Sequence, residues 1–175
     1  MGAILSILNV RAAPGQRTRG VLTAGSLAFP VALGRGGIRA NKREGDGGTP
    51  RGRFRLRQLW WRADRMARPA TLLPARRIGP QDAWCEDPSD RRYNRAMMVP
   101  SQHPGDRLRR ADQLYDLIIE IDHNTRPRVA GRGSAVFVHI ARPGLAPTAG
   151  CVAMPKPRLR QLLARLGPRT RIYIH

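Results

Sequence analysis

Short apolar segments recur along the whole chain, most of them alternating with polar residues and bounded by glycine or proline. This pattern is typical of β-strands. Residues 54–61 (FRLRQLWW) are the clearest case, because apolar and basic side chains alternate there as on a half-exposed strand. The strands predicted in this way cover residues 4–12, 20–24, 27–33, 54–61, 114–121, 135–140 and 171–174, and the first three are expected to form antiparallel hairpins.

One segment has a helical period instead. In residues 155–166 (PKPRLRQLLARL), the leucines at 159, 162, 163 and 166 follow the i, i+3, i+4, i+7 spacing of an amphipathic helix. Proline in the first turn suits a helix N-terminus, and Gly167-Pro168 ends the helix. A single further turn of helix is expected at 108–112. The predicted fold class is therefore mainly β, a sandwich-like sheet assembly with one C-terminal helix.

Residues 62–100 have neither pattern. They contain five prolines and are expected to form a long irregular loop inside one domain that spans residues 1–175. Loops of this length inside a compact domain often act as lids or binding loops. Trp84, near the centre of this loop, either anchors it to the core, which we favour, or packs over a binding site.

The residues with candidate chemistry are a histidine and a cysteine that a short loop separates. His139 lies in the apolar strand 135–140. Cys151 comes directly after Gly150, and eleven residues separate it from His139. A turn this short can return the cysteine to the side of the histidine, which would raise its thiolate fraction and support nucleophilic catalysis. The alternative is structural, since an isolated cysteine is usually a small buried hydrophobe and a strand histidine is usually a core residue.

The same residues resemble the catalytic domain of L,D-transpeptidases, the YkuD family. The resemblance rests on Val138-His139, on Thr148-Ala149-Gly150-Cys151, and on the turn and strand at 48–54 (GTPRGRF), and it extends from Val21 to the C-terminus. The family usually has His-Gly-Cys, where this chain has Ala149. It also usually has glycine after the base histidine and arginine two residues after the cysteine, where this chain has Ile140 and Ala153.

The resemblance implies a mainly β fold and a cysteine acyltransferase without metal or organic cofactor. Cys151 would be the nucleophile, His139 the general base and acid, and the carbonyl of Ile140 would orient the imidazole. The backbone N–H groups around Gly150 and Val152 are expected to form an oxyanion hole. Carbapenems, the usual covalent inhibitors of the family, would acylate Cys151.

Further site residues follow from the predicted sheet. The strand 114–121 is expected to lie beside the one that carries His139, which brings Tyr115 and His123 toward the cysteine and makes His123 a rival base. Thr148 and Trp84 complete the expected substrate-binding set. The helix that begins after Cys151 is expected to lower the pKa of the thiol if its N-terminus points at the sulfur. The other cysteine, Cys85, is given a structural role, although a bridge to Cys151 stays open.

The charge of the chain admits two interpretations. The formal net charge is +20, and of the 32 basic residues only Lys42 and Lys156 are lysines, so 30 are arginines. This is either a footprint for a polyanion or a solvated surface rich in arginine. Aromatic residues are only 5% of the chain, which leaves few stacking platforms, and no specific nucleic-acid partner is expected.

The expected substrates are peptidoglycan stem peptides or muropeptides. The favoured activity is transpeptidation with loss of terminal D-Ala through a Cys151 thioester. The alternatives are L,D-carboxypeptidation in cytoplasmic murein recycling, with water as the acceptor, and a non-catalytic module that binds polyanions or cell wall. The resemblance favours the cell envelope. However, residues 1–10 lack a basic n-region and are read as a strand, so a cytoplasmic location is the alternative. No segment is long and apolar enough to span a membrane, and the oligomeric state is open.

Overall fold

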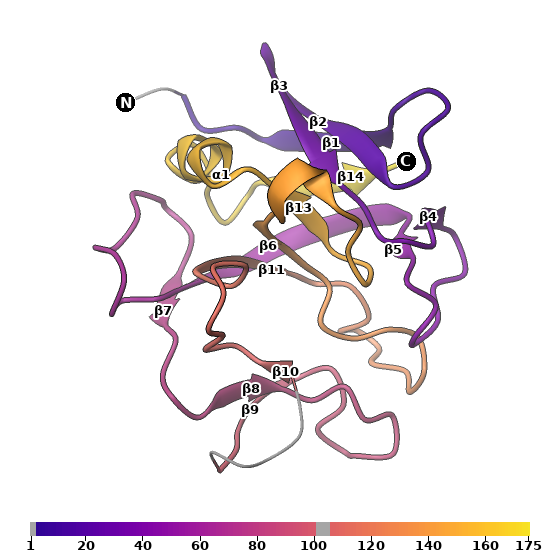
Figure 1. The fold of residues 1–175 in the computed structure, drawn as a ribbon, viewed down its shortest axis with the longest axis vertical. Helices are drawn as coiled ribbons and strands as arrows, with labels where there is room; N and C mark the ends of the chain where they lie inside the picture. The colour runs from indigo at the N-terminus through magenta and orange to yellow at the C-terminus, as the bar shows by residue number, and fades with distance from the viewer. Residues whose placement is uncertain (1–2, 101–105) are drawn as a thin grey trace.

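A computed structural model describes residues 3–100 and 106–175 of the chain (Figure 1). Most of the regular structure is β, as the sequence predicts. The strands are β1 (Ile7–Ala12), β2 (Arg19–Ala24), β3 (Leu27–Ala32), β4 (Ile38–Arg39), β5 (Thr49–Pro50), β6 (Gly52–Trp61), β7 (Ala75–Arg77), β8 (Asp82–Trp84), β9 (Ala96–Met98), β10 (Asp106–Arg107), β11 (Leu117–Ile121), β12 (Phe137–Ile140), β13 (Val152–Met154) and β14 (Arg171–Ile174). The helices are the 3-10 turn η1 (Pro143–Leu145) and α1 (Lys156–Leu163).

The main sheet closes on itself. Its strand order is β11-β12-β13-β3-β2-β1-β14-β6-β7, and β11 also pairs with β6, so the sheet forms a barrel to which β7 adds an outer edge. The ten-residue strand β6 makes this closure possible, because its first half pairs with β14 and its second half with β11. The predicted hairpins are confirmed: β2 is antiparallel to both β1 and β3. The predicted neighbours β11 and β12 are also paired, antiparallel, with Ile118 opposite His139.

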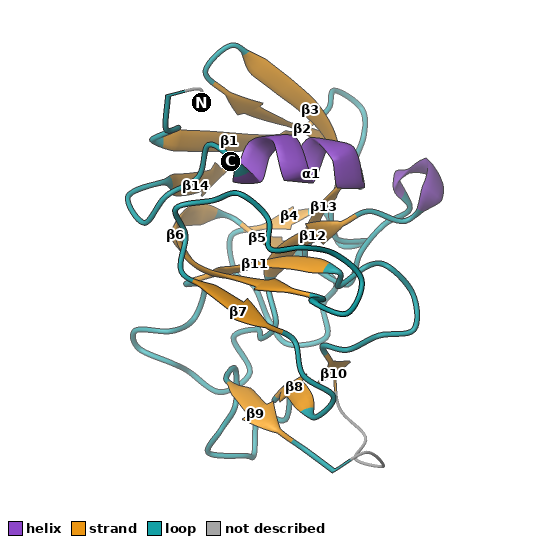
Figure 2. Cartoon of the chain, turned by 90° about the vertical axis from the view of Figure 1, so that its left-hand side faces the viewer, coloured by secondary structure: helices purple, strands orange, loops and turns teal. Residues whose placement is uncertain are grey.

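The interior of the barrel holds the main hydrophobic core, and α1 covers one of its openings (Figure 2). The helix buries Leu159, Leu162 and Leu163 against the core. It ends at Leu163, earlier than the apolar stripe predicts, and Leu166 lies beyond its end but is also fully buried there. Its N-terminal prolines fit the first turn, as predicted. Burying a leucine contributes about 1.5–3 kcal/mol, so this stripe is sufficient to hold a short helix in place.

The segment 62–100 is more regular than its sequence indicates. It contains β7, β8 and β9, and β8 pairs on either side with β9 and β10 to form a small three-stranded sheet. Figure 1 shows this sheet at the end of the molecule away from β1, β2 and β3. The prediction of an irregular loop is wrong here, because strands of two or three residues are too short to leave a period in the sequence.

A second, smaller core joins this sheet to the barrel. Its main members are Trp60, Trp84 and Phe137, and the ring of Trp84 contacts each of the other two edge to face. Trp84 is buried and donates a hydrogen bond from Nε1 to Oδ1 of Asn94 at 3.0 Å. It therefore anchors the segment to the barrel, the alternative that the sequence analysis favours.

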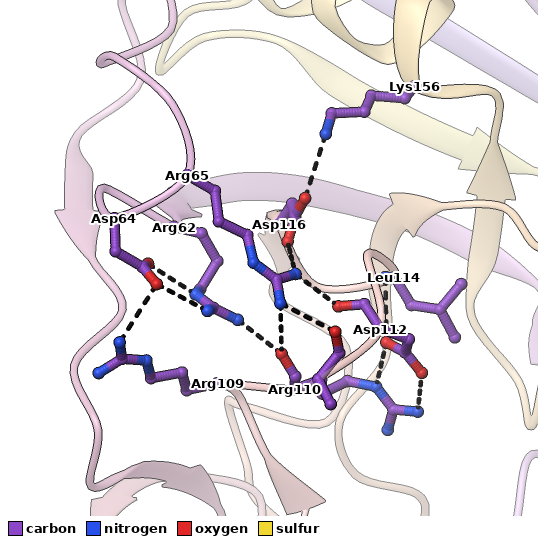
Figure 3. A network of polar contacts seen from close by, with 10 residues as sticks. Arg62, Asp64, Arg65, Arg109, Arg110, Asp112, Leu114, Asp116 and Lys156 are labelled. Carbon is purple, nitrogen blue, oxygen red and sulfur yellow. Dashed lines mark hydrogen bonds and ion pairs between the residues drawn. The ribbon is translucent and has the colours of Figure 1, made fainter.

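A network of ion pairs joins the segment that follows β6 to the segment that precedes β11 (Figure 3). Asp116 is buried and pairs with Arg65 at 2.7 Å and with Lys156 at 3.1 Å, which ties the start of α1 to the segment before β11. Arg62 pairs with Asp64 and donates a hydrogen bond to the carbonyl of Arg110. These contacts replace the predicted helical turn at 108–112, where the chain forms bends, and β11 begins three residues later than predicted. No helix in residues 3–100 and 106–175 is long and apolar enough to cross a membrane.

Candidate active site

Strand alternation puts the histidine and the cysteine on one face of the barrel. Along the approach to β12 and through the strand, Val136, Val138 and Ile140 point into the main core. Phe137 belongs to the second core outside the barrel, so His139, two residues further on, faces the same way. Cys151 belongs to that second core too.

The loop after β12 returns the chain to its neighbour. β13 runs parallel to β12, with Val152 opposite Val138, and this register places Cys151 beside Phe137. The thiol of Cys151 accepts a hydrogen bond from the Phe137 N–H at 3.4 Å and donates one to the carbonyl of Ala135 at 3.2 Å. Within the described residues it makes no hydrogen bond to His139. Catalytic contacts of this kind often form only when substrate is bound.

The ring of His139 is held by a hydrogen bond at one of its two nitrogens. Its Nδ1 lies 2.8 Å from the carbonyl oxygen of Ile140, so Nδ1 carries the proton and Nε2 is left as the acceptor. The edge of the ring meets the ring of Tyr115, with the centroids 5.3 Å apart. Burial lowers the pKa of His139 to about 4, which keeps the imidazole neutral at physiological pH.

The thiol is also neutral. Burial raises the pKa of Cys151 to about 12, and the hydrogen bond from Phe137 only partly offsets this. The expectation that a helix N-terminus lowers this pKa is wrong, because the whole of β13 separates Cys151 from the first turn of α1. In the resting protein the pair is therefore a thiol and a neutral imidazole, and not an ion pair.

Both residues line a cavity of about 420 Å³ between the barrel and the small sheet. The barrel side contributes Cys151, His139 and Thr148, and the opposite wall carries two carboxylates, Glu86 and Asp106. The remaining lining residues are Arg35, Arg110, Leu114, Tyr115, Arg142, Ala146, Pro147 and Ala149. A cavity with a nucleophile on one wall and charged groups on the other is suited to a polar, zwitterionic substrate.

Tyr115 joins the two walls. Its hydroxyl donates a hydrogen bond to Oδ2 of Asp106 at 3.1 Å, while its ring packs on His139. Burial raises the pKa of both groups, that of Tyr115 well above its usual value. Tyr115 therefore stays a hydrogen-bond donor and helps to fix the His139 ring.

The backbone around the cysteine is fixed by Thr148. Its hydroxyl donates to the carbonyl of Cys151 at 2.7 Å and accepts from the N–H of Gly150 at 3.1 Å. Gly150 has φ +146°, and a Cβ at this position would lie 2.8 Å from the carbonyl oxygen of Gly48. Glycine is required here by both the conformation and the space. The turn 48–54 noted in the sequence thus packs directly behind Gly150, next to Cys151.

The other predicted residues lie away from the cavity. His123 is not among the residues that line it; it packs edge-on against Phe54 and hydrogen-bonds through Nε2 with the carbonyl of Arg132. Trp84 is in the second core and does not line the cavity. Cys85 and Cys151 are both free thiols, so they form no bridge.

Sequence reasoning missed the support behind the thiol. Ala135, whose carbonyl accepts the thiol proton, has φ +52°, an unusual conformation for a residue other than glycine. It is held by buried Asn94, which accepts from the Ala135 N–H at 3.2 Å and donates to the carbonyls of His123 and Asn124. A lone asparagine in an irregular segment carries no sequence signal for this role. Glu86 and Asp106 were missed for the same reason.

No group of three or more potential metal-binding side chains occurs in the described ranges 3–100 and 106–175.

The model of the L,D-transpeptidase catalytic domain, YkuD, matches residues 13–174, nearly the whole chain. The chain belongs to the YkuD family. The family resemblance noted in the sequence is therefore confirmed, and the family consists of enzymes of the L,D-transpeptidase kind that act on peptidoglycan peptides. A search of curated proteins gave no match.

Proposed function

We propose that this YkuD protein is an L,D-transpeptidase that uses Cys151 as its nucleophile and His139 as its general base and acid. The observation that carries the proposal is the shared cavity, which exposes both side chains to one substrate-sized space in a chain of this family. The acyl donor is a peptidoglycan stem peptide, cleaved at the bond that releases its terminal D-Ala.

The pKa values define how the first step proceeds. Because the thiol and the imidazole are both neutral at rest, the proton passes from Sγ to Nε2 of His139 as the sulfur attacks the carbonyl. The contact between Nδ1 and Ile140 supports this direction, since it leaves Nε2 free to accept. The tetrahedral intermediate then collapses, the C–N bond breaks, and the departing amine of D-Ala takes the proton from His139. A thioester on Cys151 remains.

The negative oxygen of that intermediate needs donors. The backbone N–H groups from Gly150 to Val152 are the candidates, since they flank the sulfur. The Gly150 N–H already donates to the hydroxyl of Thr148 at 3.1 Å, so an oxyanion would share this donor with Thr148. We expect Thr148 to act as a positioning residue for the loop.

The acceptor is proposed to be an amine. Glu86 and Asp106 on the cavity wall support this choice: burial raises the pKa of both, that of Glu86 to about 7, and a bound ammonium group would favour their charged forms, whereas a water molecule needs no such partner. The ammonium gives up one proton to solvent before it attacks as an amine. The amine attacks the thioester, the C–S bond breaks, and the thiol of Cys151 takes back a proton through His139. Hydrolysis of the same thioester would give the carboxypeptidase instead.

The test is mass spectrometry of a defined disaccharide-tetrapeptide incubated with the wild-type protein, Cys151→Ala and His139→Gln. A cross-linked dimer, or exchange of an added D-amino acid for the terminal D-Ala, is expected with the wild type and not with either variant. Loss of D-Ala without a new bond would replace the transpeptidase by the L,D-carboxypeptidase. No reaction with any of the three proteins would refute the catalytic proposal and favour the binding module.

A further inference from the structure

Two clusters of arginines differ in how many acidic partners they have. In the first, four arginines and Lys156 are matched by three aspartates, at 64, 112 and 116, and every basic member has an ion pair (Figure 3). In the second, five arginines surround a hollow of about 590 Å³ whose lining contains one carboxylate, Glu120. These are Arg57, Arg76, Arg95, Arg126 and Arg128.

The single carboxylate of the hollow is already engaged. Glu120 is buried, accepts a hydrogen bond from Nε1 of Trp60 at 3.2 Å and pairs with Arg57 at 3.2 Å. Arg76 pairs with Asp82 outside the hollow. The guanidinium groups of Arg95 and Arg126 make no hydrogen bond or ion pair with any described residue, which leaves both free to bind.

The remaining arginine completes a local excess of positive charge. Arg128 donates one hydrogen bond, from Nε to the carbonyl of Asn94 at 3.2 Å, and has no acidic partner at ion-pair distance among the described residues. The positive charges of Arg95 and Arg57 add to its burial in lowering the pKa of Arg128. Like charges held this close repel each other, and a bound anion would remove that repulsion.

The aromatic residues and the guanidinium groups of the hollow indicate which class of anion it can bind. Its two tryptophans cannot stack on a base, because Arg76 covers the ring of Trp60 at 4.5 Å and Trp84 is buried. Proteins that bind single-stranded nucleic acids combine a basic groove with such stacking, and this hollow offers only the basic groups. The guanidinium fork matches a carboxylate or a phosphate with two parallel hydrogen bonds.

We propose that this hollow is a second binding site for peptidoglycan, which holds the free carboxylates of its stem peptides outside the catalytic cavity. The choice of polymer rests on the proposed function, since the family acts on peptidoglycan peptides. The hollow and the catalytic cavity share no lining residue. A second contact with the same polymer raises the local concentration of stems at Cys151 without any change in the chemistry there.

The test is cosedimentation with purified, insoluble peptidoglycan that has been stripped of other anionic polymers. All proteins carry Cys151→Ala, so that binding is measured without turnover. The test variant adds R95Q, R126Q and R128Q. The control adds R11Q, R160Q and R169Q, three exposed arginines elsewhere with no hydrogen bond or ion pair among the described residues, so both triples lose the same charge.

We expect the test variant to bind about tenfold more weakly and the control to stay within about twofold of the parent. Only the test variant loses the three proposed ion pairs between arginines and the carboxylates of peptidoglycan. Amidation of the free carboxylates on the peptidoglycan should reduce binding of the parent to the level of the test variant. Equal binding by the two triples, or binding that survives amidation, would overturn the proposal. The proposal would also be overturned if the three arginines were needed for binding to a double-stranded DNA fragment but not for binding to peptidoglycan.

Catalysis is measured separately, with Cys151 intact and the soluble disaccharide-tetrapeptide as substrate. The R95Q and R126Q double variant, which leaves the hydrogen bond from Arg128 to the carbonyl of Asn94 intact, should turn over this small substrate at the wild-type rate. If peptidoglycan binding falls as expected while the wild type shows no turnover, the second site stands and the proposed reaction fails. If the wild type turns over and both triples bind equally, the reaction stands and the second site fails.

Discussion

Burying His139 beside the thiol has a cost that depends on pH. Its imidazole is buried, its Nδ1–H is satisfied by Ile140, and no acidic group among the described residues is bonded to it. Burial lowers its pKa from 6.5 to about 4, so the folded protein resists a proton that the unfolded chain accepts. Part of the pH dependence of the fold's stability should therefore come from His139, and His139→Gln should remove that part.

The sign and size follow from linkage. Between pH 6.5 and pH 4 the unfolded state binds a proton at His139 and the folded state does not, so the free energy of unfolding falls as the pH falls. At 1.36 kcal/mol per pKa unit, the whole shift corresponds to ~3 kcal/mol, of which ~2 kcal/mol is lost between pH 7.5 and pH 5. Glu86, Asp106 and Glu120, whose pKa values burial raises, act in the opposite direction, and His123, whose pKa burial lowers, acts in the same direction as His139. All four are present in both proteins.

The assay is urea unfolding of the wild type and of His139→Gln at pH 7.5 and at pH 5, analysed as a two-state transition. The glutamine variant need not match the wild type in stability at either pH. What counts is that the wild type loses ~2 kcal/mol more than the variant on acidification. Equal losses in the two proteins would refute this reasoning, because they would mean that His139 is protonated as easily in the fold as outside it.

Two further predictions test the neighbours of this histidine. In a Cys85→Ser background, the rate of alkylation of Cys151 by iodoacetamide should rise about tenfold per pH unit from pH 7 to pH 10, since burial raises the thiol pKa to about 12; a plateau near pH 7 would indicate a thiolate–imidazolium pair instead. Gly150→Ala should lower the free energy of unfolding by on the order of 2 kcal/mol or more, because its Cβ meets the carbonyl of Gly48. Gly131→Ala, at φ +76° with open space around it, is the matched control and should lose only the backbone strain, about 1 kcal/mol.

The parts of the fold that the sequence predicts are those with a period. The hairpins of the barrel, the strand that carries His139 and the helix at 156–163 each repeat apolar residues at the spacing of their element, and each is present. The small sheet β8–β10 escapes prediction because strands of two or three residues are defined by their partners and not by a pattern. The same holds for the turn expected to be helical at 108–112, where a hydrogen bond from Arg65 to the carbonyl of Ala111 and the ion pair of Arg110 with Asp112 fix an irregular path.

The candidate site also has features that the sequence predicts and features that it does not. His139, Cys151 and Thr148 could be predicted because a short loop between two strands limits where they lie, and alternation decides that they face one side. The direction of the thiol pKa could not, since it depends on burial by a second core that the sequence does not reveal. The expected effect of the helix failed because the sequence does not show that β13 comes first.

The proposed nucleophile and the groups proposed to select the acceptor come from different parts of the chain. Cys151 and His139 stand on the barrel, whereas the opposite wall of the cavity comes from the segment between β7 and β11, which supplies Glu86, Asp106 and Tyr115. Apart from backbone hydrogen bonds such as the one from the Ile140 N–H to the carbonyl of Leu114 at 3.2 Å, that wall contacts the barrel chiefly through the side chains of Trp84 and Asn94. Its cavity-facing side chains can therefore change without disturbing the strands that hold Cys151 and His139. Changes in acceptor preference should therefore map to this segment, while loss of acylation should map to β12, β13 and the loop between them.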